Sequence, residues 1–257
     1  MGESLQIELI IAVEDHAAVL ALTSQRAYDK AAEDHGKASW GPRGYKTAKE
    51  LLYYIDQLET YSILFAAVIV GGLIVSDNGF GVKEVVRIFV DPDFQRKGIA
   101  SAALSKLMEI SEAKAWSAGT IKWNTANQGF LEKNGFSMIG EIKGDEPYIW
   151  YSLVLEEVEL PSIKELSDAM TRVIVEGEIV EKAIPRAVRS RRAWESLTVT
   201  EATLKDESGD IVLMLWNEQI KQCVVGAHVR IEGGYVKVYQ GMRQLNVGKV
   251  GKLITLS

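Results

Sequence analysis

Along the first 155 residues, the spacing of apolar positions changes repeatedly between a helical period and a strand period. Apolar residues three and four apart predict helices over residues 15–32, 47–58, 98–115 and 126–134. Between them, runs rich in Val, Ile and aromatic residues predict strands over residues 5–13, 61–68, 69–76, 82–90, 120–123, 136–142 and 148–155. We therefore expect an α+β domain in which helices flank a mixed sheet.

The longest apolar run covers residues 63–75 and contains the pair Gly71 and Gly72. Such a run is too short to cross a bilayer, which takes about 20 residues. The glycine pair indicates two strands that meet at a turn. Because Glu3 and Glu8 stand where a signal peptide carries basic residues, we expect no secretory signal, no membrane partner and a cytoplasmic protein.

After Pro161 the pattern becomes almost entirely β. Strands are predicted over residues 171–181, 195–206, 211–216, 228–238 and 250–255, with turn residues between them. Five strands in about 90 residues suit an all-β Greek-key barrel. We predict two domains, residues 1–158 and 159–257.

The net charge of the chain also changes sign near Pro161. Residues 1–161 carry 15 Lys and Arg against 23 Asp and Glu, a net charge of −8. Residues 162–257 carry 14 against 12, a net charge of +2. This asymmetry indicates two units with different partners. The second unit also contains a local basic cluster, made of Arg186, Arg189, Arg191 and Arg192.

Cysteine and histidine are too sparse for a disulfide framework or a metal centre. The single cysteine, Cys223, excludes an intramolecular disulfide and fits a reducing compartment. The three histidines are far apart, and no CxxC or HExxH pattern accompanies them. We therefore predict no metal site.

The most informative stretch runs from Val90 to Ser101, with the sequence VDPDFQRKGIAS. It leads from a strand through a turn and a Gly-containing loop directly onto a helix N-terminus. The first amides of a helix have no intrahelical partner and the helix dipole is positive there, so phosphate binds well. Gly98 permits close approach of the backbone, and Arg96 and Lys97 add positive charge.

This stretch resembles the (Gln/Arg)-x-x-Gly-x-(Gly/Ala) signature of the GNAT superfamily of N-acyltransferases. At the family's spacing it is followed by residues 124–136, NTANQGFLEKNGF, which resemble a second family segment. The order of the predicted elements over residues 5–155 also matches.

The resemblance implies acetyl-CoA as co-substrate. It implies that backbone amides of the 95–101 loop hold the pyrophosphate, that the pantetheine arm lies along the strand end before it, and that two later residues contact the coenzyme. The implied coenzyme-binding residues are Phe89, Val90, Gln95, Arg96, Lys97, Gly98, Ile99, Ala100, Ser101, Asn124 and Phe130.

In this family an amine attacks the acetyl thioester within a ternary complex. The resemblance implies that Glu84 is the base, because it stands 11 residues before Gln95, the offset of the catalytic glutamate in histone-acetylating members. The strand pattern predicts that Glu84 shares one strand face with Val86, Ile88 and Val90. The alternative is a charged residue at an exposed strand start.

The sequence departs from the family at the acid. Leu131 stands where the family usually has Tyr, and Asn127 stands where it often has Ala. Tyr148 and Tyr151 are candidates to replace the missing acid, although core packing explains each equally well. Residues 40–45 lie where family members shape the acceptor pocket.

Residues 172–257 resemble OB-fold single-stranded DNA-binding domains of the archaeal SSB and RPA type. The resemblance rests on the turn at 206–210 with the strand that follows it, and on the stretch 226–248. It implies that Trp216, Tyr235 and Tyr239 stack on bases. The basic cluster Arg186, Arg189, Arg191 and Arg192 is expected to contact phosphates. Trp216 also fits a core position, and OB barrels bind proteins as well.

These observations predict an N-acetyltransferase that acts on an amine near nucleic acid. The acceptor is expected to be a protein lysine or N-terminus, with RNA as the second choice, and single-stranded nucleic acid is the expected partner of the barrel. A non-catalytic, acetyl-CoA-sensing or nucleic-acid-binding protein is the alternative, because Leu131 replaces the usual acid.

Overall fold

The computed structural model describes residues 6–189 and 196–257. The chain forms two compact units, and each is described by itself. Unit 1 comprises residues 1–77, 83–119 and 123–136, and unit 2 comprises residues 78–82, 120–122 and 137–257. The chain passes from one unit to the other more than once.

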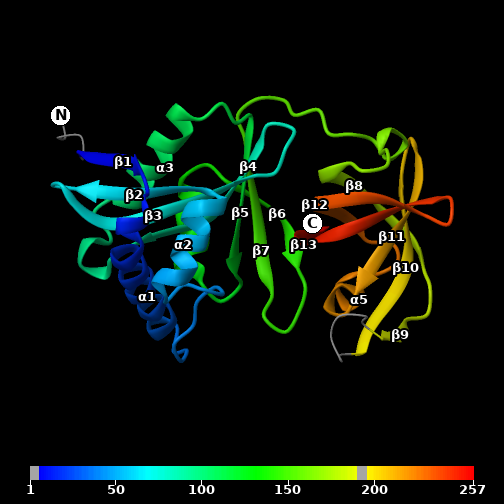
Figure 1. Cartoon of the computed structure of the whole chain (residues 1–257), viewed down its shortest axis with the longest axis horizontal. Coiled ribbons are helices and arrows are strands. Elements are labelled where there is room, and N and C mark those ends of the chain that lie inside the picture. The colour runs from blue at the N-terminus through cyan, green and yellow to red at the C-terminus, as the bar shows by residue number, and fades with distance from the viewer. Residues whose placement is uncertain (1–5, 190–195) are drawn as a thin grey trace. The chain divides into compact units, whose positions relative to one another are not determined.

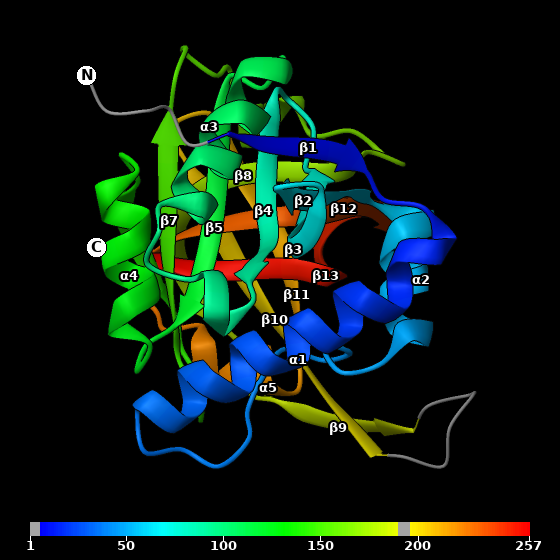
Figure 2. The ribbon, with the colours of Figure 1, turned by 90° about the vertical axis from the view of Figure 1, so that its left-hand side faces the viewer.

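Unit 1 is built on an antiparallel ladder of four strands. In chain order these are β1 (Ile7–Ile11), β2 (Glu59–Phe65), β3 (Val68–Asp77) and β4 (Val82–Val90), each paired with the next. The next strand, β5 (Ala115–Ile121), lies beside β4 in the sheet (Figure 2). The mixed sheet predicted from the sequence is therefore confirmed.

Helices cover both faces of this sheet. Helices α1 (Ala17–Asp34) and α2 (Ala48–Gln57) lie on one face, and α3 (Ile99–Ile110) lies on the other (Figure 1). On the α1 and α2 face, Leu20, Leu51 and Phe89 belong to one buried core cluster. The remaining helical segments are α4 (Thr125–Lys133) and two short 3-10 turns, η1 (Glu14–His16) and η2 (Pro92–Phe94).

The prediction of a turn at Gly71 and Gly72 is wrong. Both glycines lie inside β3, and the chain turns earlier, at Ala66 and Ala67. A Cβ on Gly71 would lie 2.4 Å from the carbonyl oxygen of Phe89, and one on Gly72 would lie 2.5 Å from the Phe89 ring. The glycines are therefore required by the close approach of β4, not by a change of chain direction.

Unit 2 contains a closed five-stranded barrel. Its strands are β8 (Thr171–Lys182), β10 (Ser196–Asp206), β11 (Gly209–Trp216), β12 (His228–Tyr239) and β13 (Met242–Leu256). They pair in the order β8–β10–β11–β13–β12, and β12 pairs back to β8. The short strand β9 (Arg186–Arg189) pairs with β10 outside this ring, and α5 (Glu218–Gln222) and η3 (Ile163–Glu165) complete the unit. The predicted barrel is confirmed.

The barrel's last strand is longer than the sequence pattern predicts. It begins at Met242, not at residue 250, because Gln240 and Gly241 adopt left-handed conformations and turn β12 directly into β13. Because Gln244 and Asn246 are polar, this part of the strand forms no apolar run, and the sequence pattern does not predict it. The core inside the barrel is apolar and includes Val175, Leu204, Leu213, Ile231 and Leu245.

Unit 2 also holds the strands β6 (Ser137–Ile142) and β7 (Tyr148–Val154). From the sequence pattern, both were expected in the first domain. Within unit 2, β6 pairs with the end of β13, where Gly140 lies opposite Leu256 and Glu141 opposite Thr255. The domain limits 1–158 and 159–257 remain a prediction.

The pairing of β6 with β13 provides a test of unit 2. A Cβ on Gly140 would lie 2.1 Å from the backbone oxygen of Thr255, a clash that only movement of a strand relieves. We expect Gly140→Ala to lower the free energy of unfolding by about 1–3 kcal/mol in urea denaturation. The control is Gly144→Ala, because a Cβ there meets nothing within 4 Å. Equal stability of the two variants would show that β6 and β13 do not pair as described.

Candidate functional site

The turn from β4 into α3 presents backbone amides at a helix start. Gly98 caps α3 with φ +83°, and no side chain caps the helix. The first bond of the helix runs from the amide of Ala102 to the carbonyl oxygen of Gly98, so the three amides before it lack an intrahelical acceptor. A Cβ on Gly98 would meet nothing within 4 Å. This open helix N-terminus fits a phosphate group, as the sequence predicted.

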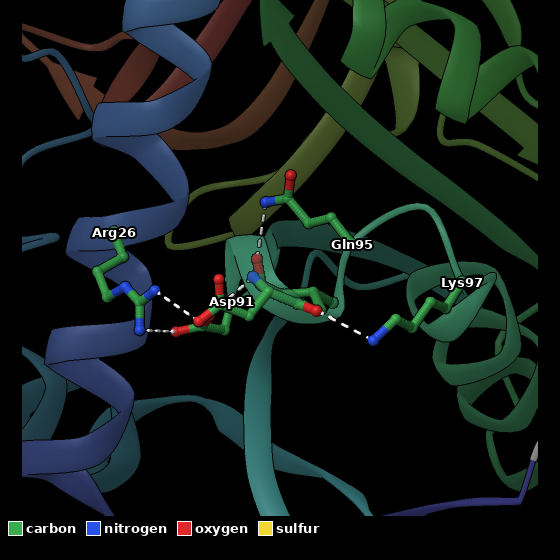
Figure 3. A network of polar contacts seen from close by, with 6 residues as sticks. Arg26, Asp91, Gln95 and Lys97 are labelled. Atoms are coloured by element: carbon green, nitrogen blue, oxygen red, sulfur yellow. Dashed lines mark hydrogen bonds and ion pairs between the residues drawn. The ribbon is translucent and has the colours of Figure 1, made fainter.

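Charged and polar side chains hold the turn in place (Figure 3). Arg26, on α1, forms ion pairs with Asp91 at 3.0 Å and with Asp93 at 2.9 Å. The hydrogen bond to Asp93 and the charge of Asp91 raise the pKa of the Arg26 guanidinium. Gln95 Nε2 donates to the carbonyl oxygen of Val90 at 2.8 Å, and Lys97 Nζ donates to that of Asp93 at 3.0 Å. Helix α1 and the end of β4 are thereby fixed to one turn.

The other coenzyme candidates lie in the same unit. Phe89 and Val90 are buried at the end of β4, and Arg96 adopts a left-handed conformation, φ +59°, within the loop. Asn124 caps α4, and its side-chain oxygen accepts from the amide of Asn127 at 3.0 Å. Phe130 is half-buried on α4. Ile99, Ala100 and Ser101 form the first turn of α3, and the Ser101 hydroxyl accepts from Asn134 Nδ2 at 3.1 Å.

Glu84 lies on β4 and is 6% exposed, so the alternative of an exposed strand start is wrong. The predicted face is wrong for Ile88 and Val90, whereas Val86 packs against the same core cluster as Phe89. Ile74 pairs with Arg87 and Val75 pairs with Val85, so Val86 is the extra residue of a β-bulge. The bulge moves Glu84 off the face of Ile88 and onto the face of Arg87 and Phe89, which α1 and α2 cover.

The position of the missing acid is filled by a core residue. Leu131 is 2% exposed on α4, and its carbonyl oxygen accepts from the amides of Asn134 and Phe136. Of the two tyrosines considered as replacements, Tyr151 is 1% exposed on β7 and Tyr148 is half-buried. Burial of Tyr151 agrees with the core-packing alternative for that residue.

The loop between α1 and α2 is fixed to α1 through Asp29. This carboxylate accepts from the hydroxyls of Ser39 at 2.7 Å and Tyr45 at 2.8 Å, and Lys46 Nζ lies 3.7 Å away. Desolvation alone would raise the pKa of Asp29, but these hydrogen bonds and the charge of Lys46 outweigh it and lower the pKa. The loop expected to shape the acceptor pocket is thus ordered by contacts that the sequence did not predict.

Arg87 was also not predicted as a site residue. It is buried on β4, its Nη2 donates to Tyr54 Oη at 2.9 Å and to the carbonyl oxygen of Arg43, and its guanidinium carbon lies 4.4 Å from the centre of the Tyr54 ring. The available signal was a cation, Arg87, between apolar residues in the second half of the strand VKEVVRIFV.

In the barrel, register places the three predicted aromatic residues on one face. Met214, Asn246 and Tyr235 lie in one row across β11, β13 and β12. Trp216 stands two residues beyond Met214, and Tyr239 stands four residues beyond Tyr235, so alternation puts both on the face of that row. Tyr235 is 39% exposed and Tyr239 is 52% exposed, while Trp216 is half-buried and absent from the core cluster of the barrel.

Only part of the basic cluster can be placed. Arg186 begins β9 with an exposed side chain, 3.9 Å from Glu201, so a carboxylate offsets part of its charge. The backbone of Arg189 ends β9. Arg191 and Arg192 lie outside the described residues. Lys237, on the aromatic face between the two tyrosines, lies 5.8 Å from the centre of the Tyr239 ring and adds a positive charge that was not predicted.

Neither a metal centre nor a membrane span is found in residues 6–189 and 196–257. Their acidic, histidine and cysteine side chains form no group of three that would hold a metal ion. No helix in these ranges is both long and apolar enough to cross a membrane.

Comparison with known proteins matches one family model to each of two stretches of the chain. Residues 25–136 match the Acetyltransferase (GNAT) family, and residues 164–255 match the family described as Single-stranded DNA binding protein Ssb-like, OB fold. The chain contains a GNAT acetyltransferase domain and an Ssb-like OB domain. The name GNAT domain is used for residues 25–136, and the name OB domain for residues 164–255.

Individual relatives cover one domain each. The single-stranded DNA-binding protein Ssb of Saccharolobus solfataricus is 28% identical over 92 residues, which are 36% of this chain and 61% of that protein. A GNAT-family acetyltransferase from Streptococcus agalactiae has the same fold, with a TM-score of 0.53 and 17% identity over 59% of this chain and 96% of its own. The N-acetyltransferase PaiA of Thermoplasma acidophilum, solved with coenzyme A, gives a TM-score of 0.48 and 13% identity over 58% of this chain and 99% of its own.

Proposed function

We propose that the GNAT domain transfers the acetyl group of acetyl-CoA to an amine, and that the OB domain holds the protein on single-stranded nucleic acid near its acceptors. The observation that carries the first part is the open N-terminus of α3, formed by left-handed Gly98 in a domain of an acetyltransferase family. The acceptor we propose is a lysine or N-terminus of a protein associated with nucleic acid, with RNA as the second choice.

The chain's own groups divide the work of transfer. The amides of Ile99, Ala100 and Ser101, with the positive end of the α3 dipole, bind the coenzyme's phosphate groups. Acetyl-CoA supplies an acetyl thioester. Glu84 accepts a proton from the acceptor amine, because a protonated amine has no lone pair for attack.

The departing thiolate has no tyrosine donor at position 131, where Leu131 belongs to the core. A protein that binds acetyl-CoA without turning it over is therefore the second candidate function. Steady-state release of thiol in the presence of amine acceptors separates the two, because a sensor releases none.

Replacement of Glu84 by Gln tests the base. Glutamine keeps the shape of the side chain and cannot accept the proton, so we expect turnover to fall by about 10²–10⁴ with little change in coenzyme affinity. The matched control is Glu109→Gln, an exposed position on α3, which should leave turnover unchanged. Rates measured across pH complete the test, and a Glu84→Gln profile that matches the wild type would exclude Glu84 as the base.

Replacement of Tyr235 and Tyr239 by Ala tests the nucleic-acid face. Stacking on one base contributes about 1–3 kcal/mol, so each variant should bind a single-stranded oligonucleotide at least several-fold more weakly in fluorescence anisotropy. Affinity should also fall steeply as salt rises. Val238→Ala is the control, because Val238 lies between Lys237 and Tyr239 on the opposite side of β12. Binding that depends equally on Val238, or on neither tyrosine, would contradict stacking on this face.

A further inference from the structure

Arg87 is a buried cation without a charged partner among the residues that the structure describes. Its residue is 4% exposed, and no carboxylate among residues 6–189 and 196–257 lies within 4.0 Å of its guanidinium. Both of its hydrogen bonds use Nη2, and both acceptors, Tyr54 Oη and the Arg43 carbonyl oxygen, are neutral. Nη1 is buried and has no hydrogen-bond partner in the same ranges. A buried charge with an unused donor is costly to the fold unless an anion completes it.

The position of Arg87 on β4 connects this unused donor with the proposed base and with the loop expected to shape the acceptor pocket. The β-bulge at Val86 places Arg87 on the same face of β4 as Glu84, the proposed base. Along a strand that rises about 3.3 Å per residue, the two Cα atoms are roughly 7–10 Å apart. The second Arg87 hydrogen bond is accepted by the carbonyl oxygen of Arg43, in the loop between α1 and α2.

We propose that Arg87 selects the acceptor by binding a carboxylate that lies beside the reacting amine. The acceptor class is a peptide with a free amine and a neighbouring acidic side chain. The planar fork of a guanidinium binds the two oxygens of a carboxylate in parallel. Glu84 on the same face and Glu50, whose side chain lies against Gly44, disfavour a dianionic phosphate more than a carboxylate.

In the structure this site is closed, because Nη1 is inaccessible to solvent. Residues 41–45 are closely packed: a Cβ on Gly41 would lie 2.6 Å from the Tyr45 ring within the segment, and one on Gly44 would lie 2.9 Å from the Glu50 side chain on α2. Entry of the acceptor requires this loop to move. The acceptor carboxylate then replaces the Arg43 carbonyl on Nη2 and takes the unused Nη1.

The inference rests on the proposed function, and its test uses two C-terminally amidated peptides, Glu-Ala-Ala and Gln-Ala-Ala, with free N-terminal amines. Their binding to the full-length protein saturated with coenzyme A is measured by calorimetry, and their kcat/KM is measured by thiol release. We expect the wild type to prefer the Glu peptide by about 10–100-fold in both measurements. In Arg87→Met the two peptides should become equal, and Arg87→Lys should retain part of the preference.

The matched control is Tyr54→Phe, which removes one neutral partner of Nη2 and keeps the ring and the cation. It should preserve the preference for the Glu peptide. If Arg87 only fastened the 41–45 loop, Arg87→Met and Tyr54→Phe would weaken both peptides alike, and the proposal would be overturned. If Arg87→Met does not fold, the wild-type comparison decides, because equal binding of the two peptides overturns the proposal. A Glu preference in binding without any thiol release would leave the carboxylate site standing and refute the transferase function.

Discussion

The proposed coenzyme site depends on one constraint: the chain must turn from β4 into α3 without covering the first amides of the helix. Left-handed Gly98 makes the turn, and the helix begins without a side-chain cap. Other contacts keep this arrangement rigid. Arg26 joins α1 to Asp91 and Asp93, and Gln95 closes the turn against the Val90 carbonyl. A preorganised set of donors binds a phosphate without first having to be ordered, which is where such a site gains affinity.

A second local irregularity, the β-bulge at Val86, determines which side chains of β4 share a face. Without the bulge at Val86, strict alternation would separate Glu84 from Arg87 and Phe89. With it, a carboxylate, a guanidinium and a core aromatic ring share the face that α1 and α2 cover. One extra residue in β4 therefore brings Glu84, the proposed base, and Arg87, the proposed carboxylate-binding group, to one side of the sheet. Bulges commonly serve to redirect side chains near functional sites.

The sequence predicts what short-range rules determine. The helix after Gly98, the mixed sheet and the five-stranded barrel follow from periodicity and turn residues, and the structure confirms each. The sequence also predicts the loop before α3, because a glycine that directly precedes an amphipathic helix indicates a turn into the helix N-terminus. The aromatic residues of the barrel were predicted from resemblance, and register places them on one face.

What the sequence does not predict depends on contacts between distant segments. Gly71 and Gly72 resemble a turn, but they are required by the backbone and ring of Phe89, on the next strand. The bulge at Val86 has no local signal, because neither glycine nor proline stands in the strand VKEVVRIFV. Arg26 and Asp29 look like ordinary surface residues of α1 until the structure shows their partners. The pairing of β6 with β13 joins residues more than a hundred positions apart.

The central claim is tested most directly by coenzyme A affinity in two glycine-to-valine variants. Gly98 and Gly226 both have φ +83°, and a Cβ at either meets nothing within 4 Å, so valine strains the backbone equally at both. Only Gly98 lies at the start of α3. Isothermal titration calorimetry should show affinity for coenzyme A at least about tenfold lower in Gly98→Val and unchanged in Gly226→Val. Equal affinity in Gly98→Val and the wild type would show that the coenzyme binds elsewhere.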